Sequence, residues 1–307
     1  ATGSLDLGVI AQQITQHGIS EATIVAVVCI LAGFGYKISA APFHMWAPDV
    51  YEGSPTPITA FFSVGPKAAG FAVILRFFHD ALGTGAALDA NTEVPWPMIV
   101  GLLAIATMTV GNLSALGQKS VKRMLAYSSI AHAGYMLLGV VAFSDRGASA
   151  VVFYIAVYCF MNLGAFLVVL AVAEKTGKET LDAYEGLGFR APGLAAAMAL
   201  FLFSLTGLPP MAGFVGKFYL FSALVERGGD LNAFLAVIGV VNSVVSLFYY
   251  ARVLRAMYLA KPAAPAAIEV RKSYGWTVGL LAVPTLVLGV YWAPVYDFIS
   301  RSLVMLR

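Results

Sequence analysis

Long apolar segments separated by short polar ones dominate the hydrophobic pattern of this sequence. A helix needs about 20 consecutive apolar residues to cross the roughly 30 Å of hydrocarbon in a bilayer. Eight segments meet this requirement, so the pattern predicts an all-α membrane protein with about eight transmembrane helices. The predicted spans are residues 21–41, 57–80, 96–117, 121–143, 149–173, 192–225, 231–259 and 274–298.

Two of the predicted spans are interrupted by proline. The first continues into Pro42, and the sixth contains Pro209 and Pro210 within the segment LTGLPPMAG. Proline removes a backbone donor and breaks a helix, and the flanking glycines loosen the backbone further. Irregular backbone at membrane depth is tolerated only where it is buried in protein or lines a hydrated cavity. We therefore predict two broken helices whose breaks face the interior of the bundle.

Composition favours a membrane protein over a soluble one. Of the 307 residues, 60% are apolar and 11% are charged, and the mean hydropathy is +0.82. A soluble domain of this length does not have such a composition. The net charge of +3 comes from basic residues spread over short loops rather than gathered in a stripe. We therefore expect a lipid bilayer around the chain and no nucleic-acid partner.

Motifs for bond chemistry are absent from the sequence. There is no P-loop, no GxGxxG after a strand, no CxxC and no HExxH. Cys29 and Cys159 lie in apolar runs without a neighbour at metal-ligand spacing, so we interpret both as small hydrophobic residues. Residues 1–20 are polar and do not resemble a signal peptide, which predicts an extramembrane segment. The sequence thus predicts transport, with no metal or cofactor bound by this chain.

Lysine and arginine alternate in number between the two sides of the predicted membrane. The loops after the third, fifth and seventh spans contain eleven of them, and the opposite segments contain five. Because basic residues are retained on the cytoplasmic side, the richer loops are predicted to be cytoplasmic. The eleven are Lys119, Lys122, Arg123, Lys175, Lys178, Arg190, Arg252, Arg255, Lys261, Arg271 and Lys272, and the five are Arg76, Arg146, Arg227, Arg301 and Arg307.

Three further lysines, Lys37, Lys67 and Lys217, fall inside predicted spans. A lysine near the bilayer centre costs about 2.5–3.5 kcal/mol on insertion scales, so such residues usually face the bundle interior and mark an ion path. Desolvation disfavours the charged form of an amine, which suits a group that must gain and lose a proton. The alternatives are snorkelling to an interface for Lys37 and Lys217, and a structural lysine bonded to carbonyls for Lys67. We favour proton transfer for all three.

A polar helix face surrounds His132 in the middle of the fourth predicted span. Ser128, Ser129 and Tyr135 lie at helical spacing from it. Imidazole titrates near neutral pH, so His132 is a candidate proton relay. A lone histidine can equally be a satisfied hydrogen-bond partner between helices, and the sequence leaves both interpretations open. We interpret His44, just beyond the first break, as structural.

Carboxylates are scarce near the membrane segments. Asp49 and Glu52 lie at the predicted cytoplasmic edge, where they could form a funnel through which protons enter. A helix cap with a loop contact is the alternative, and we favour it slightly. No acidic residue lies deep in a span, so Lys37 has no carboxylate partner within this sequence.

Several long motifs resemble one membrane-protein family. YKISAAPFHMWAPDVYEGSPTP from Tyr36, GPKAA from Gly65, QKSVKRMLAYSSIAHAGY from Gln118 and LTGLPPMAGFVGKFY from Leu205 are similar to the antiporter-like membrane subunits of respiratory complex I, the NADH:quinone oxidoreductase. The resemblance covers essentially the whole chain. Motifs of this length are much more specific than a short pattern.

The resemblance implies a fold of fourteen helices that contains two inverted five-helix repeats, each with a broken helix. The eight spans would then be the seventh to fourteenth, so that 1–20 is an extramembrane segment, 21–80 ends the first repeat, 96–259 forms the second and 274–307 is a C-terminal helix. The family's glutamate on the fifth helix has no counterpart here, and the chain is expected to lack the N-terminal helices.

The resemblance also implies residue roles. Lys37 and Lys217 match the lysines of the two broken helices, Lys67 matches the lysine that connects them, and His132 falls on a helix with polar relay residues. Because half of the first repeat is absent, Lys37 lacks the helices that would enclose it.

A function follows from the same resemblance. We expect a proton-translocating, multi-pass subunit of a bacterial inner-membrane complex, with NAD, FMN, iron–sulfur clusters and quinone bound by other subunits. Its partners would be other membrane-arm subunits, including related antiporter-like ones. The alternatives are a subunit of a multisubunit Na⁺/H⁺ antiporter or of a membrane-bound hydrogenase, and a membrane-arm scaffold that does not pump.

Overall fold

Helices make up the regular structure throughout the part of the chain that the computed structural model describes, residues 2–18, 20–82, 96–261 and 267–305. The elements are α1 (Leu7–His17), α2 (Glu21–Ile38), α3 (Trp46–Gly53), α4 (Thr56–Leu82), α5 (Trp96–Leu116), α6 (Val121–Val141), α7 (Asp145–Thr176), the 3-10 helix η2 (Leu181–Tyr184), α8 (Leu187–Arg190), α9 (Pro192–Thr206), α10 (Ala212–Arg227), α11 (Asp230–Leu259), α12 (Lys272–Val290) and α13 (Ala293–Met305).

Seven helices of the described segments are long and apolar enough to cross a membrane, namely α2, α4, α5, α6, α7, α11 and α12. Each corresponds to one predicted span. The remaining span, 192–225, is divided between α9 and α10, which have 15 and 16 residues and are too short to cross alone. The predicted all-α membrane fold is confirmed, with the break in its sixth span.

The last predicted span was too long. Helix α12 ends at Val290, and a separate helix α13 begins at Ala293 and contains Pro294 in its first turn. Proline fits the first turn of a helix, where its missing N–H has no partner to lose, but it disrupts a helix interior. The chain therefore breaks before Pro294 rather than continuing to residue 298.

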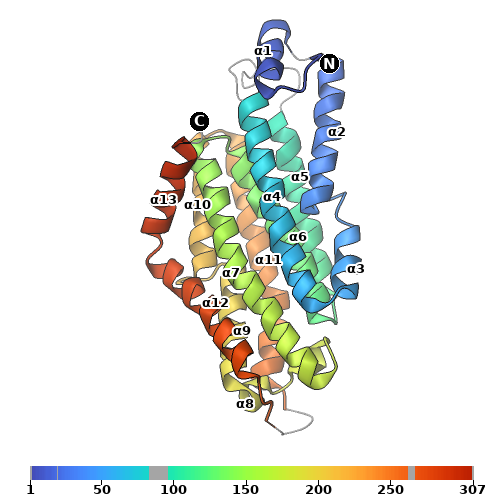
Figure 1. The fold of residues 1–307 in the computed structure, drawn as a ribbon, viewed down its shortest axis with the longest axis vertical. Helices are drawn as coiled ribbons and strands as arrows, with labels where there is room; N and C mark the ends of the chain where they lie inside the picture. Colours follow the sequence, from blue (N-terminus) through green and yellow to red (C-terminus); the bar gives the residue numbers. More distant parts are fainter. Residues whose placement is uncertain (1, 19, 83–95, 262–266, 306–307) are drawn as a thin grey trace.

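Residues 2–18 are more structured than their polar composition suggested. Asp6 caps α1 by accepting a hydrogen bond from the Val9 amide at 3.0 Å. Ala11 and Ile14 share one face of α1 and are buried. Figure 1 shows α1 beyond the end of α4, so this segment forms a small cap on the bundle.

Helix α6 lies at the centre of the bundle (Figure 1). Of the residues in its most apolar 18-residue stretch, 94% are buried inside the protein. Its contact with α5 is close because Gly111 and Gly134 have no side chain. A Cβ atom at Gly111 would lie 2.6 Å from the Ala131 nitrogen, and one at Gly134 would lie 2.8 Å from the Met108 nitrogen. Small residues permit such backbone approach in membrane bundles.

The first break separates α2 from α3. Ser39 ends α2 in the left-handed region with φ 61°, and Pro42 follows within the turn. Thr107 of α5 accepts a hydrogen bond from the Ala41 amide at 3.0 Å, which satisfies a donor that the break frees from the helix.

The second break lies between Thr206 and Ala212. Gly207 takes a left-handed conformation with φ 90°, and Pro209 and Pro210 follow it. Ser204 then accepts a hydrogen bond from the Gly213 amide at 3.0 Å, which ties the start of α10 to the end of α9. Both prolines therefore lie in the turn, as the sequence predicted.

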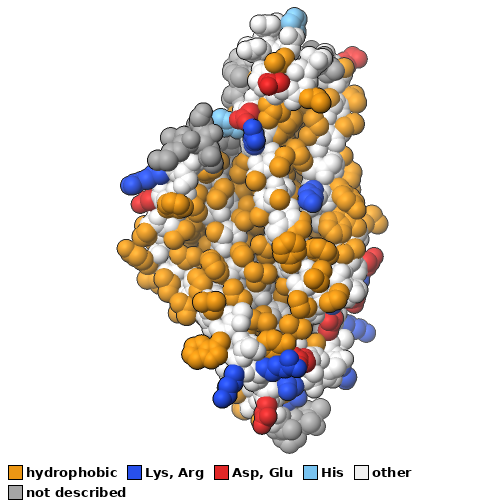
Figure 2. Space-filling view, viewed as in Figure 1, with side chains coloured by type: hydrophobic (Ala, Val, Ile, Leu, Met, Phe, Trp, Pro, Cys, Tyr) orange, Lys and Arg blue, Asp and Glu red, His pale blue; other side chains and the backbone are white. Residues whose placement is uncertain are grey.

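Apolar side chains cover the middle of the face shown in Figure 2, and charged side chains gather towards its ends. The loops after α5, α7 and α11 meet at one end, which we call the basic end. Here Val121 donates to the Glu179 carbonyl at 2.9 Å, and Arg271 pairs with Glu174 at 2.5 Å. Arg146 pairs with Glu226 at the opposite end. Among the described residues, the alternation of loops predicted from the basic residues thus matches the fold; Arg307 lies outside them.

Candidate functional site

Lys67 is buried between α4 and α6. It directly follows Pro66, and its side chain is only 2% exposed. Its ammonium donates to the Ser129 carbonyl at 2.5 Å and to the Ser129 hydroxyl at 2.8 Å. Oxygen atoms of one residue on α6 therefore hold the amine of Lys67 inside the bundle.

His132 lies one turn further along α6 and is 1% exposed. Its Nδ1 is 2.6 Å from the Tyr154 hydroxyl on α7, and its Nε2 is 3.5 Å from the Tyr250 hydroxyl on α11. Ser128 is 2.5 Å from the same Tyr250 hydroxyl. The imidazole thus bridges hydroxyl groups of two other helices.

Lys217 lies in the second turn of α10 and is 3% exposed. Its ammonium donates to the carbonyls of Leu205 and Thr206 at 3.1 and 2.9 Å, and to the Ser243 hydroxyl at 3.2 Å. These carbonyls belong to the last turn of α9, where a helix leaves its carbonyls without internal partners. The break after Thr206 therefore creates the site that holds the amine.

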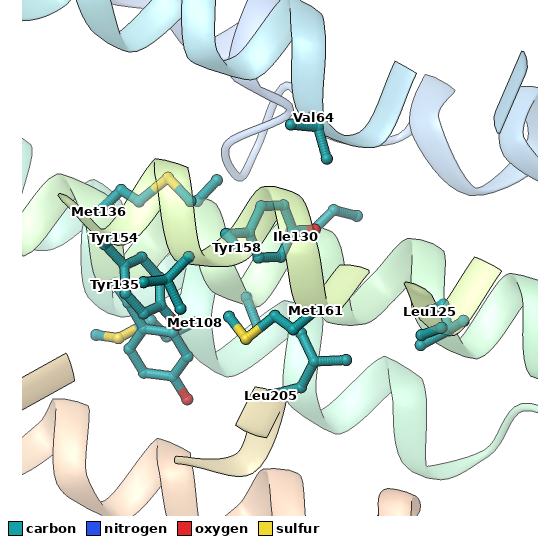
Figure 3. Close-up of a cluster of buried hydrophobic side chains, with 14 of the residues drawn as sticks. Val64, Met108, Leu125, Ile130, Tyr135, Met136, Tyr154, Tyr158, Met161 and Leu205 are labelled. Atoms are coloured by element: carbon teal, nitrogen blue, oxygen red, sulfur yellow. The ribbon is translucent and has the colours of Figure 1, made fainter. Parts of the chain in front are cut away.

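Aromatic and apolar side chains enclose the three groups. The Lys217 ammonium lies 4.3 Å from the centre of the Tyr135 ring, and the His132 ring is 5.0 Å from that of Tyr158. Figure 3 shows Tyr135, Tyr154 and Tyr158 in a buried cluster with methionine and leucine side chains. Within the described segments neither Lys67 nor Lys217 forms a salt bridge with a carboxylate. Neutral oxygen atoms and an aromatic ring are what stabilise these amines.

Lys37 does not share this environment. It lies in the last turn of α2, beside the first break as predicted, but its side chain is exposed. This corrects the expectation that all three lysines face the bundle interior and agrees with the expectation that Lys37 lacks enclosing helices. Helix α2 lies at the edge of the bundle and packs mainly on α4, so only one side of it is covered. The stem of Lys37 lies near Gly70 of α4.

Asp49 and Glu52 lie at the basic end, on α3, and both form ion pairs with Arg123. Asp49 is 2.7 Å from the guanidinium. The paired geometry is that of a contact between α3 and α6. It gives these carboxylates a structural partner, and within the described residues neither carboxylate contacts Lys67 or Lys217.

Lys122 is a buried lysine that the sequence reasoning missed. It was counted among the loop residues, yet it is 3% exposed. Its ammonium donates to the carbonyls of Glu52 and Ser54 at 3.1 and 2.8 Å and to the Glu179 carboxylate at 3.0 Å. It therefore ties the end of α3 to the start of α6. Nothing in the residue pattern distinguishes it from its neighbour Arg123.

A buried amide network was also missed. Asn112 on α5 donates to the hydroxyl of Tyr135 at 3.2 Å and to the backbone carbonyl of Asn242 at 3.0 Å. The Tyr249 hydroxyl donates to Oδ1 of the Asn112 amide at 3.0 Å. An asparagine inside an apolar span was the available signal, because polar side chains in membrane helices usually bond across helices.

The comparisons with known proteins agree with this arrangement. Residues 1–246 match the family described as NADH:quinone oxidoreductase/Mrp antiporter, TM. The chain belongs to this family. Family members related in sequence are the NADH-quinone oxidoreductase subunit N 2 of Sorangium cellulosum (strain So ce56), 64% identical over 300 residues, and the subunit N of Anaeromyxobacter sp. (strain Fw109-5), 54% identical over 298 residues. Subunit N is also the member of the antiporter-like family whose motifs the sequence resembles most.

The chain spans less than two thirds of these relatives. The matches cover 97% and 93% of this chain but 59% and 57% of the two subunits.

Solved structures show the same antiporter-like fold. A chain of respiratory complex I from Thermus thermophilus with bound aureothin matches with a TM-score of 0.79 and 35% identity, over 97% of this chain and 62% of that one. A chain of the Mrp complex from Dietzia sp. DQ12-45-1b matches with a TM-score of 0.84 but 22% identity, over 97% and 62%, which shows a shared fold alone.

Proposed function

We propose that this chain is the proton-translocating part of a membrane-arm subunit of NADH:quinone oxidoreductase, and that Lys67, His132 and Lys217 carry the protons. The observation that carries the proposal is that two buried lysines, each bonded only to neutral oxygen atoms within the described residues, share the bundle interior with a buried histidine. Both amines are close enough to act electrostatically on His132. Buried ionisable groups of this kind in membrane helices usually belong to ion paths.

The surroundings of each amine suit reversible protonation. Carbonyl and hydroxyl oxygens accept hydrogen bonds from an ammonium, and a hydroxyl can also donate to a neutral amine. Ser129 at Lys67 and Ser243 at Lys217 supply such hydroxyls. Because no carboxylate neutralises the charge within the described residues, a nearby change of charge or hydration shifts the balance between the two forms. Redox chemistry in other subunits would supply that change.

The remaining features of the proposal concern the whole complex. NAD, FMN, iron–sulfur clusters and quinone would be bound by other subunits, and this chain would contribute translocase activity. Related antiporter-like subunits would be its neighbours in the membrane arm. The basic end would face the cytoplasm, because basic loops are retained on that side. Membership of NADH-quinone oxidoreductase is favoured over an Mrp antiporter by the 64% and 22% identities of the respective relatives.

Lys217 provides the direct test. The full-length subunit with Lys217→Ala or Lys217→Arg would be expressed in its complex, and membranes assayed for complex content, NADH-dependent quinone reduction and proton translocation. Both variants should assemble and translocate fewer protons per NADH. Alanine has no proton to carry, and a guanidinium group does not release its proton at physiological pH. The exposed Lys178→Met variant is the control.

Other outcomes would identify the alternatives. If Lys217→Ala lowers complex content while each assembled complex pumps normally, the chain acts as a scaffold. If translocation requires Na⁺ and continues without NADH, an antiporter is indicated.

A further inference from the structure

Two consecutive tyrosines of α11, Tyr249 and Tyr250, are buried in the bundle beside the proposed relay. Their ring centres are 4.4 Å apart. Consecutive residues on a helix point in different directions, so the pair reaches two regions of the protein from one place on α11.

Tyr250 reaches inwards to the relay. Its hydroxyl is 3.5 Å from His132 Nε2, while His132 Nδ1 is engaged by Tyr154 at 2.6 Å. Ser128 contacts the same Tyr250 hydroxyl at 2.5 Å. With Nδ1 donating to Tyr154, Nε2 has its lone pair free to accept a proton from the Tyr250 side.

Tyr249 reaches towards the basic end. It lines a hollow of about 10 Å³, which has room for about one water molecule. The hollow is also lined by Gln118, Lys119 and Arg252, and Lys119 is exposed at the protein surface. Apolar side chains, among them Val121 and Met124, complete the lining of the hollow. One side of Tyr249 therefore adjoins a small surface hollow with a mixed lining, and the other side adjoins Tyr250.

Asn112 fixes the position of the Tyr249 hydroxyl. Its Oδ1 accepts from Tyr249 at 3.0 Å, and its Nδ2 donates to the Asn242 carbonyl at 3.0 Å. Because a backbone carbonyl can only accept, this second bond sets which end of the amide faces Tyr249. An amide does not readily carry a proton, so Asn112 holds the tyrosine rather than continuing the path itself.

We propose that Tyr249 and Tyr250 form a proton connection between the basic end and His132, with Asn112 as the residue that positions it. This proposal rests on the proposed function. A proton arriving from water in the hollow binds the Tyr249 oxygen as the hydroxyl proton of Tyr249 passes to Tyr250. The hydroxyl proton of Tyr250 passes in turn to His132 Nε2. Each tyrosine ends with one proton, as it began, and His132 gains one; transfer in the opposite direction reverses every step.

This connection is separate from Asp49 and Glu52. Those carboxylates pair with Arg123 on the α3 side of α6, whereas Tyr249 approaches from α11. It also reaches His132 without passing through Lys67 or Lys217. The histidine would therefore be a junction of three branches rather than a link in a single line.

The test compares Tyr249→Phe with Tyr184→Phe in the full-length subunit of the assembled complex. Both changes remove one hydroxyl from a buried tyrosine, and the Tyr184 hydroxyl has no hydrogen-bond partner within the described residues. The measurements are complex content, NADH-dependent proton translocation into inverted membrane vesicles, and the ratio of coupled turnover in H₂O to that in D₂O. Tyr249→His, which can again carry a proton, serves as the rescue variant.

We expect Tyr249→Phe to translocate several-fold fewer protons per NADH than Tyr184→Phe and to show a larger solvent isotope effect, because proton delivery becomes limiting. Tyr249→His should partly restore proton translocation and partly reverse the increase in the isotope effect. A purely structural role would lower complex content without raising the isotope effect, and that result would overturn the proposal. If Tyr249→Phe does not assemble, Tyr249→His provides the test. Translocation and an isotope effect equal to those of the wild type would support the connection. A loss of translocation without an increased isotope effect would reject it.

Lys217→Ala, measured in parallel, separates a failure of the tyrosine connection from a failure of the proposed function. If Lys217→Ala abolishes translocation and Tyr249→Phe equals Tyr184→Phe, the tyrosine connection is wrong and the proposed function stands. If Lys217→Ala also leaves translocation unchanged, both fail.

Discussion

Gly289 allows α12 to pack directly against the second helix break. It is buried, and a Cβ atom built on it would lie 1.9 Å from the Pro210 carbonyl oxygen and 2.7 Å from the Met211 carbonyl carbon. Ordinary Cβ contacts begin at 3.4 Å, so the Cβ atom of Gly289→Ala would be too close to the Pro210 carbonyl oxygen by roughly 1.5 Å. The obstructing atoms are backbone, and no side-chain rotation can relieve the overlap.

The expected effect of Gly289→Ala is a loss of stability of about 3 kcal/mol, the upper part of the range for overpacking in a close-packed interior. That corresponds to a change of about a hundredfold in the ratio of folded to unfolded subunit. Gly279, nearly three turns earlier on the same helix, is the matched control because no atom lies within 4 Å of its built Cβ. Alanine is the better helix former by about 1 kcal/mol, so Gly279→Ala should be neutral or slightly stabilising.

The assay is retention of the full-length subunit in the purified complex after heating in mild detergent. The temperature at which half of the subunit is lost should fall for Gly289→Ala and should be unchanged or higher for Gly279→Ala. Equal midpoints for the two variants would refute the close packing of α12 on the break. A lower midpoint for Gly279→Ala alone would reverse the assignment of the buried and exposed faces of α12.

Two further substitutions, with Lys178→Met again as the control, test how individual polar contacts contribute. They use the retention assay and the translocation assay. Lys122→Met should destabilise the subunit by about 3 kcal/mol, because it leaves the Glu179 carboxylate and two carbonyls without their buried cation. Lys178→Met removes an exposed ion pair that solvent screens, so retention of the subunit should change little; equal losses for Lys122→Met and Lys178→Met would contradict this explanation. Ser129→Ala leaves Lys67 its carbonyl partner but removes the hydroxyl, so translocation should fall while retention changes little.

Helix positions were predictable because the bilayer imposes a length on each apolar run. The double proline located the division between α9 and α10 for the same reason, since two missing donors cannot continue a helix. Two features with visible signals were still missed. Pro294 marked the start of α13, and the apolar positions Leu7, Ile10, Ala11 and Ile14 have the spacing of one helical face in α1.

The buried lysines were predictable, but their partners were not. Lys67 and Lys217 stand out in the sequence because they fall inside apolar spans, away from the loops that hold the other basic residues. Their hydrogen-bond partners come from elsewhere: Ser129 is 62 residues from Lys67, and Ser243 is 26 residues from Lys217. Such contacts depend on which helices become neighbours. Helix burial also depends on neighbours: the apolar surroundings of Lys37 in sequence suggest burial, and its exposure follows from the position of α2 at the edge of the bundle.

Lys122 shows why burial alone does not identify a proton carrier. Its ammonium faces a carboxylate, so removing its proton would leave the negative charge of Glu179 without compensation. The ammonium groups of Lys67 and Lys217 face only neutral oxygens within the described residues, and removing a proton there leaves no charge behind. Desolvation then acts on these two lysines without an opposing ion. The distinction between a structural lysine and a transporting one therefore lies in the charge of its partner, which the sequence does not display and the fold does.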